Sequence, residues 1–178
     1  MFLKFTVLCV LLGLVSLSAG YVITPNIVDG VPESLDIATA PFIKIGENYY
    51  LIETKRANWF DAFESCRQKE ADLVAFESLE ELQLVSQYII NNNLTAFYWT
   101  SGTDLAKQDE HVWFSSGQPV ASDLWREGEP NNANDEEHCD DLKIQPERGV
   151  GLNDKKCSIK GPYICKAPQP KTASFIVW

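Results

Sequence analysis

Four cysteines constrain this 178-residue chain more than any other feature. They are Cys66, Cys139, Cys157 and Cys165, while the fifth cysteine, Cys9, lies in an apolar leader. An even number of cysteines in a secreted chain indicates two disulfides, and four cysteines allow three pairings. A zinc site is the alternative, but the sequence contains no Cys-x-x-Cys pair. We therefore expect a fold that two disulfides hold together.

The leader, residues 1–20, has the layout of a secretory signal peptide, with one lysine near its start, an apolar run and then small residues. The alternative is a membrane anchor, but the apolar run over 5–17 is short for a bilayer span. We expect cleavage near Gly20 and a secreted, extracellular protein. The rest of the chain is expected to form an N-terminal arm at 21–40, one domain at 41–166 and a C-terminal tail at 167–178.

The chain is strongly acidic, with 15 Lys and Arg against 25 Asp and Glu and a formal net charge of −10. Lys4 is the only charged residue of the leader, so the remainder carries 14 basic and 25 acidic residues, a net charge of −11. Such a chain is repelled by nucleic acid and by anionic membrane surfaces. Its partners are expected to be metal ions, sugars or other proteins.

The order of the predicted elements indicates an α+β domain. A hairpin is predicted over 42–52, where two apolar runs flank a Gly-Glu-Asn turn. Asn58 is expected to begin a first helix, and Ser78 with Glu81 forms a capping box at the start of a second helix. Short strands alternate with loops after these helices, and the stretch 115–154 is almost all loop by composition.

Residues 129–141, EPNNANDEEHCDD, concentrate carboxylate and amide side chains without a single Lys or Arg. A second cluster, Asn153-Asp154, comes shortly before Cys157. Oxygen donors of this kind suit calcium, which takes six to eight of them. An EF-hand that starts at Asp135 is excluded, because Asp140 stands where that loop needs glycine. The alternative interpretation is an acidic, solvated surface.

The sequence resembles a C-type lectin-like domain, and most closely the short secreted invertebrate lectins. The resemblance covers residues 42–166, most of the chain after the leader. It rests on the following motifs: Glu129-Pro130-Asn131, Glu137 two residues before Cys139, Asn153-Asp154 before Cys157, Trp113-x-x-Ser-Gly-Gln-Pro and Trp125-x-x-Gly-Glu-Pro-Asn. It implies two helices packed on small antiparallel sheets, with a long calcium- and sugar-binding loop region. It also implies that Cys66 pairs with Cys165 and Cys139 with Cys157.

The resemblance further implies one Ca²⁺ ion, with a cis peptide bond before Pro130. The implied ligands of calcium, and of the sugar bound to it, are Glu129, Asn131, Glu137, Asn153 and Asp154. Carboxylates accept the protons of two sugar hydroxyls and amides donate to their oxygens, which explains why both side-chain types are needed. The Glu-Pro-Asn motif implies mannose, fucose or N-acetylglucosamine (GlcNAc). The alternatives are galactose, or a protein ligand in place of a sugar.

The chain departs from the family pattern at a second, auxiliary calcium site. By spacing, the positions of that site fall at Asp104, Gln108, Asn132, Glu137 and His138. Three of these residues are not acidic where the calcium-binding pattern has acids, so a second calcium is expected to be absent or weakly bound. His111 is interpreted as a turn residue, and Asp140 and Asp141 as solvated surface.

Catalysis is not expected, because the acidic loop has no evident apolar cover to raise the pKa of a carboxylic acid and every cysteine after the leader is assigned. We expect no catalytic residues and a role in innate immunity, by agglutination or opsonisation of cells whose glycans are recognised. Asn93-Leu94-Thr95 is an N-glycosylation acceptor. An oligomer is possible through the domain surface or the N-terminal arm.

Overall fold

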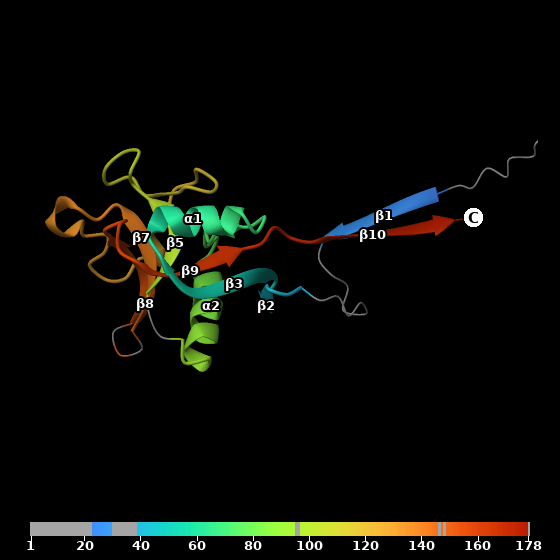
Figure 1. Ribbon diagram of the computed structural model, residues 1–178, viewed down its shortest axis with the longest axis horizontal. Coiled ribbons are helices and arrows are strands. Elements are labelled where there is room, and N and C mark those ends of the chain that lie inside the picture. Colours follow the sequence, from blue (N-terminus) through green and yellow to red (C-terminus); the bar gives the residue numbers. More distant parts are fainter. Residues whose placement is uncertain (1–22, 30–38, 95–96, 146, 148, 178) are drawn as a thin grey trace, which may run out of the picture.

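The computed structural model describes residues 23–29, 39–94, 97–145, 147 and 149–177 (Figure 1). The leader at 1–20 and its cleavage site lie outside the described residues, as does Thr95 of the glycosylation tripeptide. Within the described part of the chain, no helix is long and apolar enough to cross a membrane.

The first helix, α1 (Trp59–Arg67), begins where the sequence predicts. The side chain of Asn58 accepts the backbone N–H of Asp61 at 2.9 Å, which satisfies one of the free amides of the first turn. Trp59, Ala62 and Cys66 recur at helical spacing and are all buried, so one face of α1 packs on the domain.

The second helix, α2 (Leu79–Asn91), also begins at its predicted cap. Ser78 Oγ accepts the backbone N–H of Glu81 at 3.2 Å. The return bond goes one residue further back than in a standard capping box, since Glu81 Oε2 accepts the N–H of Glu77 at 2.7 Å. Leu82, Val85 and Ile89 form the buried stripe of the helix, and Asn92 caps its C-terminus.

Eight strands form a mixed sheet whose main path runs β2-β3-β9-β5-β7-β8. In chain order they are β2 (Ile43–Ile45), β3 (Asn48–Ala57), β4 (Asp72–Leu73), β5 (Phe97–Thr103), β6 (Val112–Trp113), β7 (Cys139–Gln145), β8 (Gly149–Lys155) and β9 (Gly161–Lys166). Strands β4 and β6 pair with β9 and β5, and only β5 and β9 run parallel. The predicted hairpin is β2 with β3, and the α+β class is confirmed.

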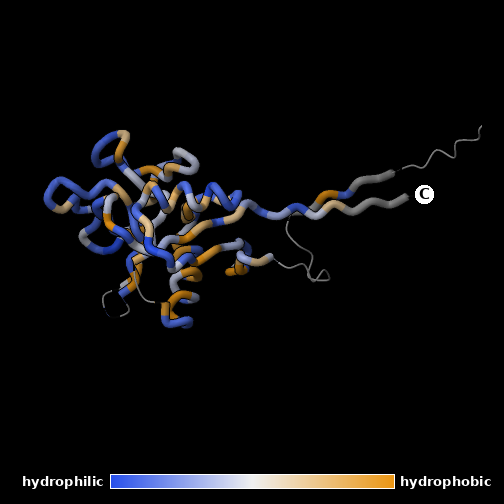
Figure 2. Tube along the Cα trace, viewed as in Figure 1, coloured by the Kyte–Doolittle hydropathy of each residue, from blue (hydrophilic) through white to orange (hydrophobic). Residues whose placement is uncertain are grey.

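Two buried apolar clusters hold the layers together. One lies under α2 and includes Tyr50, Leu82, Leu142 and Leu152, and the other surrounds Trp59 and Trp99 under α1. In Figure 2 hydrophobic residues gather along the helices and central strands, while the loops at the far end of the domain are largely hydrophilic. The loops are nevertheless anchored to the core, because Leu124 is buried in the first cluster and Val120 and Trp125 pack against it.

Both disulfides implied by the family resemblance are present. Cys66 of α1 joins Cys165 of β9 with 5.4 Å between their Cα atoms, and Cys139 of β7 joins Cys157 with 5.1 Å. The first bridge ties α1 to a strand 99 residues later. The second bridge joins the start of β7 to the segment just after β8, so it closes the base of the acidic region.

The prediction that 115–154 is almost all loop was wrong in its second half. Strands β7 and β8 pair there in continuous register from Cys139↔Lys155 to Gln145↔Gly149. The polar residues that suggested a loop lie on buried strand positions, among them Asp140, Asp141, Asn153 and Asp154. Only the first half, with the short 3₁₀ turns η1 (Ser122–Leu124) and η2 (Ala133–Asp135), is irregular.

The N-terminal arm and the C-terminal tail also contain strands that the sequence did not predict. Strand β1 (Ile23–Asp29) pairs antiparallel with β10 (Lys171–Val177) in a two-stranded ribbon. Figure 1 shows this ribbon projecting away from the body of the domain.

Candidate functional site

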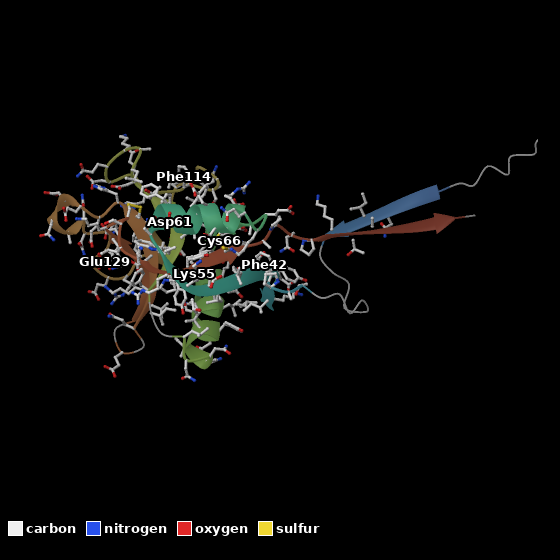
Figure 3. The ribbon with its side chains drawn as sticks, in the orientation of Figure 1. Phe42, Lys55, Asp61, Cys66, Phe114 and Glu129 are labelled. Carbon is white, nitrogen blue, oxygen red and sulfur yellow. A yellow bond between two sulfur atoms is a disulfide. The ribbon has the colours of Figure 1, made fainter. Side chains whose placement is uncertain are left out.

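The predicted site lies at the end of the domain away from the β1–β10 ribbon, where Figure 3 labels Glu129. The loop that carries Glu129 is attached to β8 through its backbone. The N–H of Arg126 donates to Leu152 O at 3.0 Å, and the N–H of Glu129 donates to Arg126 O at 3.1 Å. The Glu129-Pro130 peptide bond is cis, as the family resemblance implies.

The carboxylate of Asp154 holds the segment that follows Pro130. Its Oδ1 accepts the backbone N–H of Asn131 at 3.0 Å, and its Oδ2 accepts that of Asn132 at 2.5 Å. Hydrogen bonds to an ionised acceptor are among the stronger ones in proteins. Asp154 is itself fully buried on β8, so these two bonds place Asn131 against a rigid strand.

Glu137 is oriented by Asn132, which adopts a left-handed backbone conformation with φ of 40°. The backbone N–H of Glu137 donates to Asn132 Oδ1 at 3.0 Å, and Glu137 Oε2 accepts the N–H of Ala133 at 3.3 Å. Asparagine tolerates the left-handed region better than most residues. Asn132 therefore closes the loop between Asn131 and Glu137, at a position where the auxiliary calcium pattern has an acid.

Asn153 lies on β8, next to Asp154, and its side chain makes three hydrogen bonds. Its Nδ2 donates to Asp141 Oδ1 at 2.9 Å and also to the backbone carbonyl of Asp154, while its Oδ1 accepts from Lys143 Nζ at 3.3 Å. The sequence prediction missed both Lys143 and Asp141. Their alternation after Cys139 was the available signal, because residues two apart on a strand share one face.

The electrostatics of the site are those of crowded carboxylates. Burial raises the pKa of the Glu129 carboxyl, the adjacent Asp154 carboxylate raises it further, and Glu137 adds to the same effect. Lys143 opposes the shift without cancelling it. A cation placed among these three carboxylates would remove the repulsion, because an opposite charge nearby favours the ionised form.

Four of the five predicted ligands are linked by hydrogen bonds to one another, and the fifth, Glu137, is linked to them through Asn132. Asn131 Nδ2 donates to Glu129 Oε2, Asp154 accepts from Asn131 and Asn132, and Asn132 orients Glu137. Three carboxylates and two amides form a donor set that fits calcium. Among the described residues, His, Cys, Asp and Glu form no group of three placed to hold a metal ion.

A different arrangement occupies the positions of the auxiliary calcium site. Asp104 Oδ1 accepts from His138 Nδ1 at 2.9 Å, and Asp104 Oδ2 accepts the backbone N–H of Asp109 at 2.9 Å. His111 Nδ1 donates to Asp140 Oδ1 at 2.8 Å, and its Nε2 lies 3.8 Å from Asp104 Oδ2. Two imidazoles therefore face two buried carboxylates.

The interpretation of Asp140 and Asp141 as solvated surface was wrong, since both are fully buried in β7. Burial raises the pKa of Asp140 to about 6 against the pull of His111, and that of Asp141 to about 7 against the pull of Lys155. His111 is also more than a turn residue. Burial alone would lower its pKa, but the hydrogen bond and charge of Asp140 outweigh burial and raise it.

Gly102 on β5 makes room for the buried Asp140. A Cβ atom at position 102 would lie 2.1 Å from Asp140 Oδ2, a distance at which a side chain must be displaced. The residue is required here for close approach, which is a common reason for glycine inside a strand.

The chain is similar in sequence to known C-type lectins. A model of the lectin C-type domain matches residues 55–167. C-type lectin 37Da of Drosophila melanogaster is 37% identical over 161 residues, which cover 87% of this chain and 87% of that protein. The matched region contains both disulfides and all five predicted ligands.

Two solved structures share the fold. The SPL-1–GlcNAc complex is 27% identical with a TM-score of 0.62, covering 72% of this chain and 93% of that chain. The mouse scavenger receptor C-type lectin carbohydrate-recognition domain is 24% identical with a TM-score of 0.63, covering 75% and 98%. The second likeness concerns the fold alone.

Proposed function

The chain belongs to the C-type lectin family, whose domains bind carbohydrate, and we propose that it is a secreted, calcium-dependent lectin for neutral sugars. One observation carries the proposal. Asp154, buried on β8, accepts both backbone amides that follow Pro130, which links the half of the proposed ligand set on the Glu129 loop to the half on β8. Neither half of the set supplies enough oxygen donors for calcium alone.

Glu129, Asn131, Glu137, Asn153 and Asp154 are proposed to hold the ion. When bound, calcium supplies a positive centre that the oxygens of two neighbouring sugar hydroxyls approach. Glu129 and Glu137 would each accept a hydrogen bond from one of the two hydroxyls, since an ionised carboxylate only accepts. The amides of Asn131 and Asn153 donate to the same hydroxyl oxygens. The family is generally non-enzymatic, and this arrangement binds a sugar without any bond being broken.

The proposed sugar class is mannose, fucose or GlcNAc. The Glu-Pro-Asn motif supports this choice, and the related SPL-1 structure is a GlcNAc complex. Galactose is the alternative within the same mechanism. Secretion, a role in innate recognition by agglutination or opsonisation, and glycosylation of Asn93 complete the proposal. Asn93 is exposed just beyond α2, on a segment separate from the Glu129 loop.

A glycan array probed with calcium and again with EDTA tests the proposal. Binding to mannose-, fucose- or GlcNAc-terminated glycans is expected with calcium and should disappear with EDTA. Binding that survives EDTA would contradict calcium bridging. Absence of glycan binding under both conditions would favour a lectin-like domain that binds a protein.

The sugar class has its own test in a double substitution. Glu129→Gln with Asn131→Asp keeps the side-chain sizes but exchanges the positions of acceptor and donor groups around the ion. Preference is expected to shift from mannose to galactose by roughly tenfold in relative affinity, the size of about one hydrogen bond. An unchanged preference would mean that residues elsewhere in the loops choose the sugar.

A further inference from the structure

The ribbon formed by β1 and β10 has two open edges. Its register is continuous over all seven pairs, from Ile23↔Val177 to Asp29↔Lys171. Among the residues that the structure describes, no third strand joins this sheet. A two-stranded ribbon is marginally stable alone in water, and unpaired strand edges are templates for another strand. The ribbon therefore has open edges that can accept a further strand.

Pro25 distinguishes the two edges. Proline has no backbone N–H, so in an uninterrupted ladder its nitrogen must face away from the partner strand. The outer edge of β1 therefore lacks one donor at Pro25. The alternation of an antiparallel pair then sets which residues of β10 face outward, because Phe175 is paired with Pro25. They are Lys171, Ala173, Phe175 and Val177, and each has both a backbone N–H and a C=O.

Charge indicates that a second copy of this chain can occupy the open edge. The whole chain carries a net charge of −10, so two copies repel each other over most of their surface. The ribbon is an exception, because its only charged residues are Asp29 and Lys171, which lie opposite each other. It also projects from the domain, so two ribbons can meet while the acidic domains stay apart (Figure 1).

We propose that two copies of the chain associate by antiparallel pairing of β10 with β10, which forms a four-stranded sheet across a two-fold axis. A pairing centred on Ser174 uses the full length of the strand and all four outward-facing residues. It sets Ala173 against Phe175 of the second copy, and Lys171 against Val177. The same edge serves both copies, as a two-fold interface requires, and no like charges face each other.

Apolar residues of the ribbon support association. Ile27 on β1 is 66% exposed, both strands are rich in β-branched residues, and β10 also contains Phe175. The Glu129 loop lies at the opposite end of the domain from the ribbon, so the pairing leaves that loop uncovered (Figure 3). Two loops in one particle would raise the avidity for a repetitive surface without any new contact to the ligand. The pairing itself does not depend on what the loop binds.

A pair of proline substitutions at opposed positions tests the interface. Ala173 and Ile27 face each other in the ribbon, and both occupy pairs whose N–H groups point outward. Ala173→Pro removes a donor from the β10 edge, and Ile27→Pro removes one from the β1 edge, while the bonds between β1 and β10 remain. Ala173→Thr is the matched control, since it keeps the N–H and favours a strand.

The measurement is the molar mass of the full chain by sedimentation equilibrium over a range of concentrations. The wild type, Ala173→Thr and Ile27→Pro are expected to reach twice the monomer mass. Ala173→Pro is expected to weaken association at least about tenfold, because one substitution removes a bond in each half of the interface. Near-ultraviolet circular dichroism verifies that each variant keeps the folded domain.

Three results would overturn the proposal: a monomeric wild type at all concentrations, a dimer unaffected by Ala173→Pro, or a dimer lost only in Ile27→Pro. The last result would place the interface on β1. A change in the circular dichroism of Ala173→Pro would be resolved with Phe175→Pro, which removes the next outward donor of the same edge.

Discussion

Two groups of carboxylates lie close together in this molecule, and the two groups have different hydrogen-bond partners. Around Asp104 and Asp140, imidazoles of the same chain face the acids at hydrogen-bond distance. Around Glu129 and Asp154, the hydrogen-bond partners are backbone and side-chain amides, and the carboxyl of Glu129 has a raised pKa. The first group has imidazole partners within the chain, whereas the second has amide donors in place and an excess of negative charge.

The difference explains why the two regions are expected to respond differently to calcium. A histidine within reach of a buried carboxylate competes with any added ion for the same oxygens. Amides compete far less, because their carbonyl oxygens can themselves bind calcium. Substitutions should therefore separate the two groups: changes near Asp140 affect folding, and changes near Glu129 affect binding of the ion.

The largest expected effect is on folding, from His111→Ala. The variant leaves Asp140 buried at 0% exposure without its imidazole partner, and loss of one member of a buried ion pair costs about 3–5 kcal/mol. Urea denaturation at pH 7 measures the loss. His138→Ala is the control, because that side chain is 30% exposed and should cost only about 1 kcal/mol. Equal losses would mean that burial does not distinguish the two histidines.

The same group predicts a dependence of stability on pH. The pKa of Asp140 is raised from 3.8 to about 6, and the pKa of His111 is raised above 6.5. The folded state therefore holds protons that the unfolded state has released, so stability is fully present below pH 3.8. The contribution of Asp140 is lost as pH rises from 3.8 through about 6, and that of His111 is lost as pH rises beyond 6.5.

Thermal unfolding in EDTA, with Asp140→Asn as the reference, measures this dependence. The free energy of unfolding of the wild type should fall by about 3 kcal/mol relative to the variant between pH 4 and pH 7. Parallel pH curves for the two proteins would show that Asp140 titrates normally.

Glu137→Gln should act on the ion and leave folding nearly unchanged. The substitution keeps the shape of the side chain but removes one of three proposed ligand charges, and calcium affinity is expected to fall about 100-fold, or about 2.7 kcal/mol. Glu136→Gln is a matched control at the neighbouring, exposed position. Calorimetric titration of both variants with calcium measures the two affinities. A similar loss of affinity in Glu136→Gln would mean that the effect comes from the overall charge of the loop and not from a ligand at position 137.

A smaller effect is expected from Asn132→Ala. This change removes the acceptor of the Glu137 backbone N–H, a bond of 3.0 Å, without removing a proposed ligand. Residues that orient ligands typically contribute 10–100-fold to affinity, and we expect about tenfold here. A loss as large as that of Glu137→Gln would instead indicate that Asn132 itself binds the ion.

Much of the fold was predictable because its signals are local. Asn58 and Ser78 cap helices through bonds that span three residues, and the hairpin over 42–52 follows from alternation and a turn. Strands β7 and β8 were missed because their polar residues are buried and pair with groups distant in the sequence, as Asp140 does with His111. A composition rich in Asp and Asn favours loop unless such partners are known.

The candidate site also contains residues that the sequence identified and residues that it did not. The Glu129 motif and Asn153-Asp154 were recognisable as family motifs, and both disulfides followed from the same resemblance. Lys143 and His111 were not, because their partners, Asn153 and Asp140, are reached only through strand pairing. The pairing of β1 with β10 joins the two ends of the described chain, a contact for which neither segment carries a local signal.

The stoichiometry of calcium binding by isothermal titration calorimetry tests the contrast between the two carboxylate groups most directly. One ion per chain is expected for the wild type and for Asp104→Asn, and none for Asp154→Asn over the same concentration range. Folding of each variant is verified by circular dichroism. Two ions in the wild type, or an ion that is lost in Asp104→Asn and retained in Asp154→Asn, would contradict the assignment of calcium to the Glu129 loop.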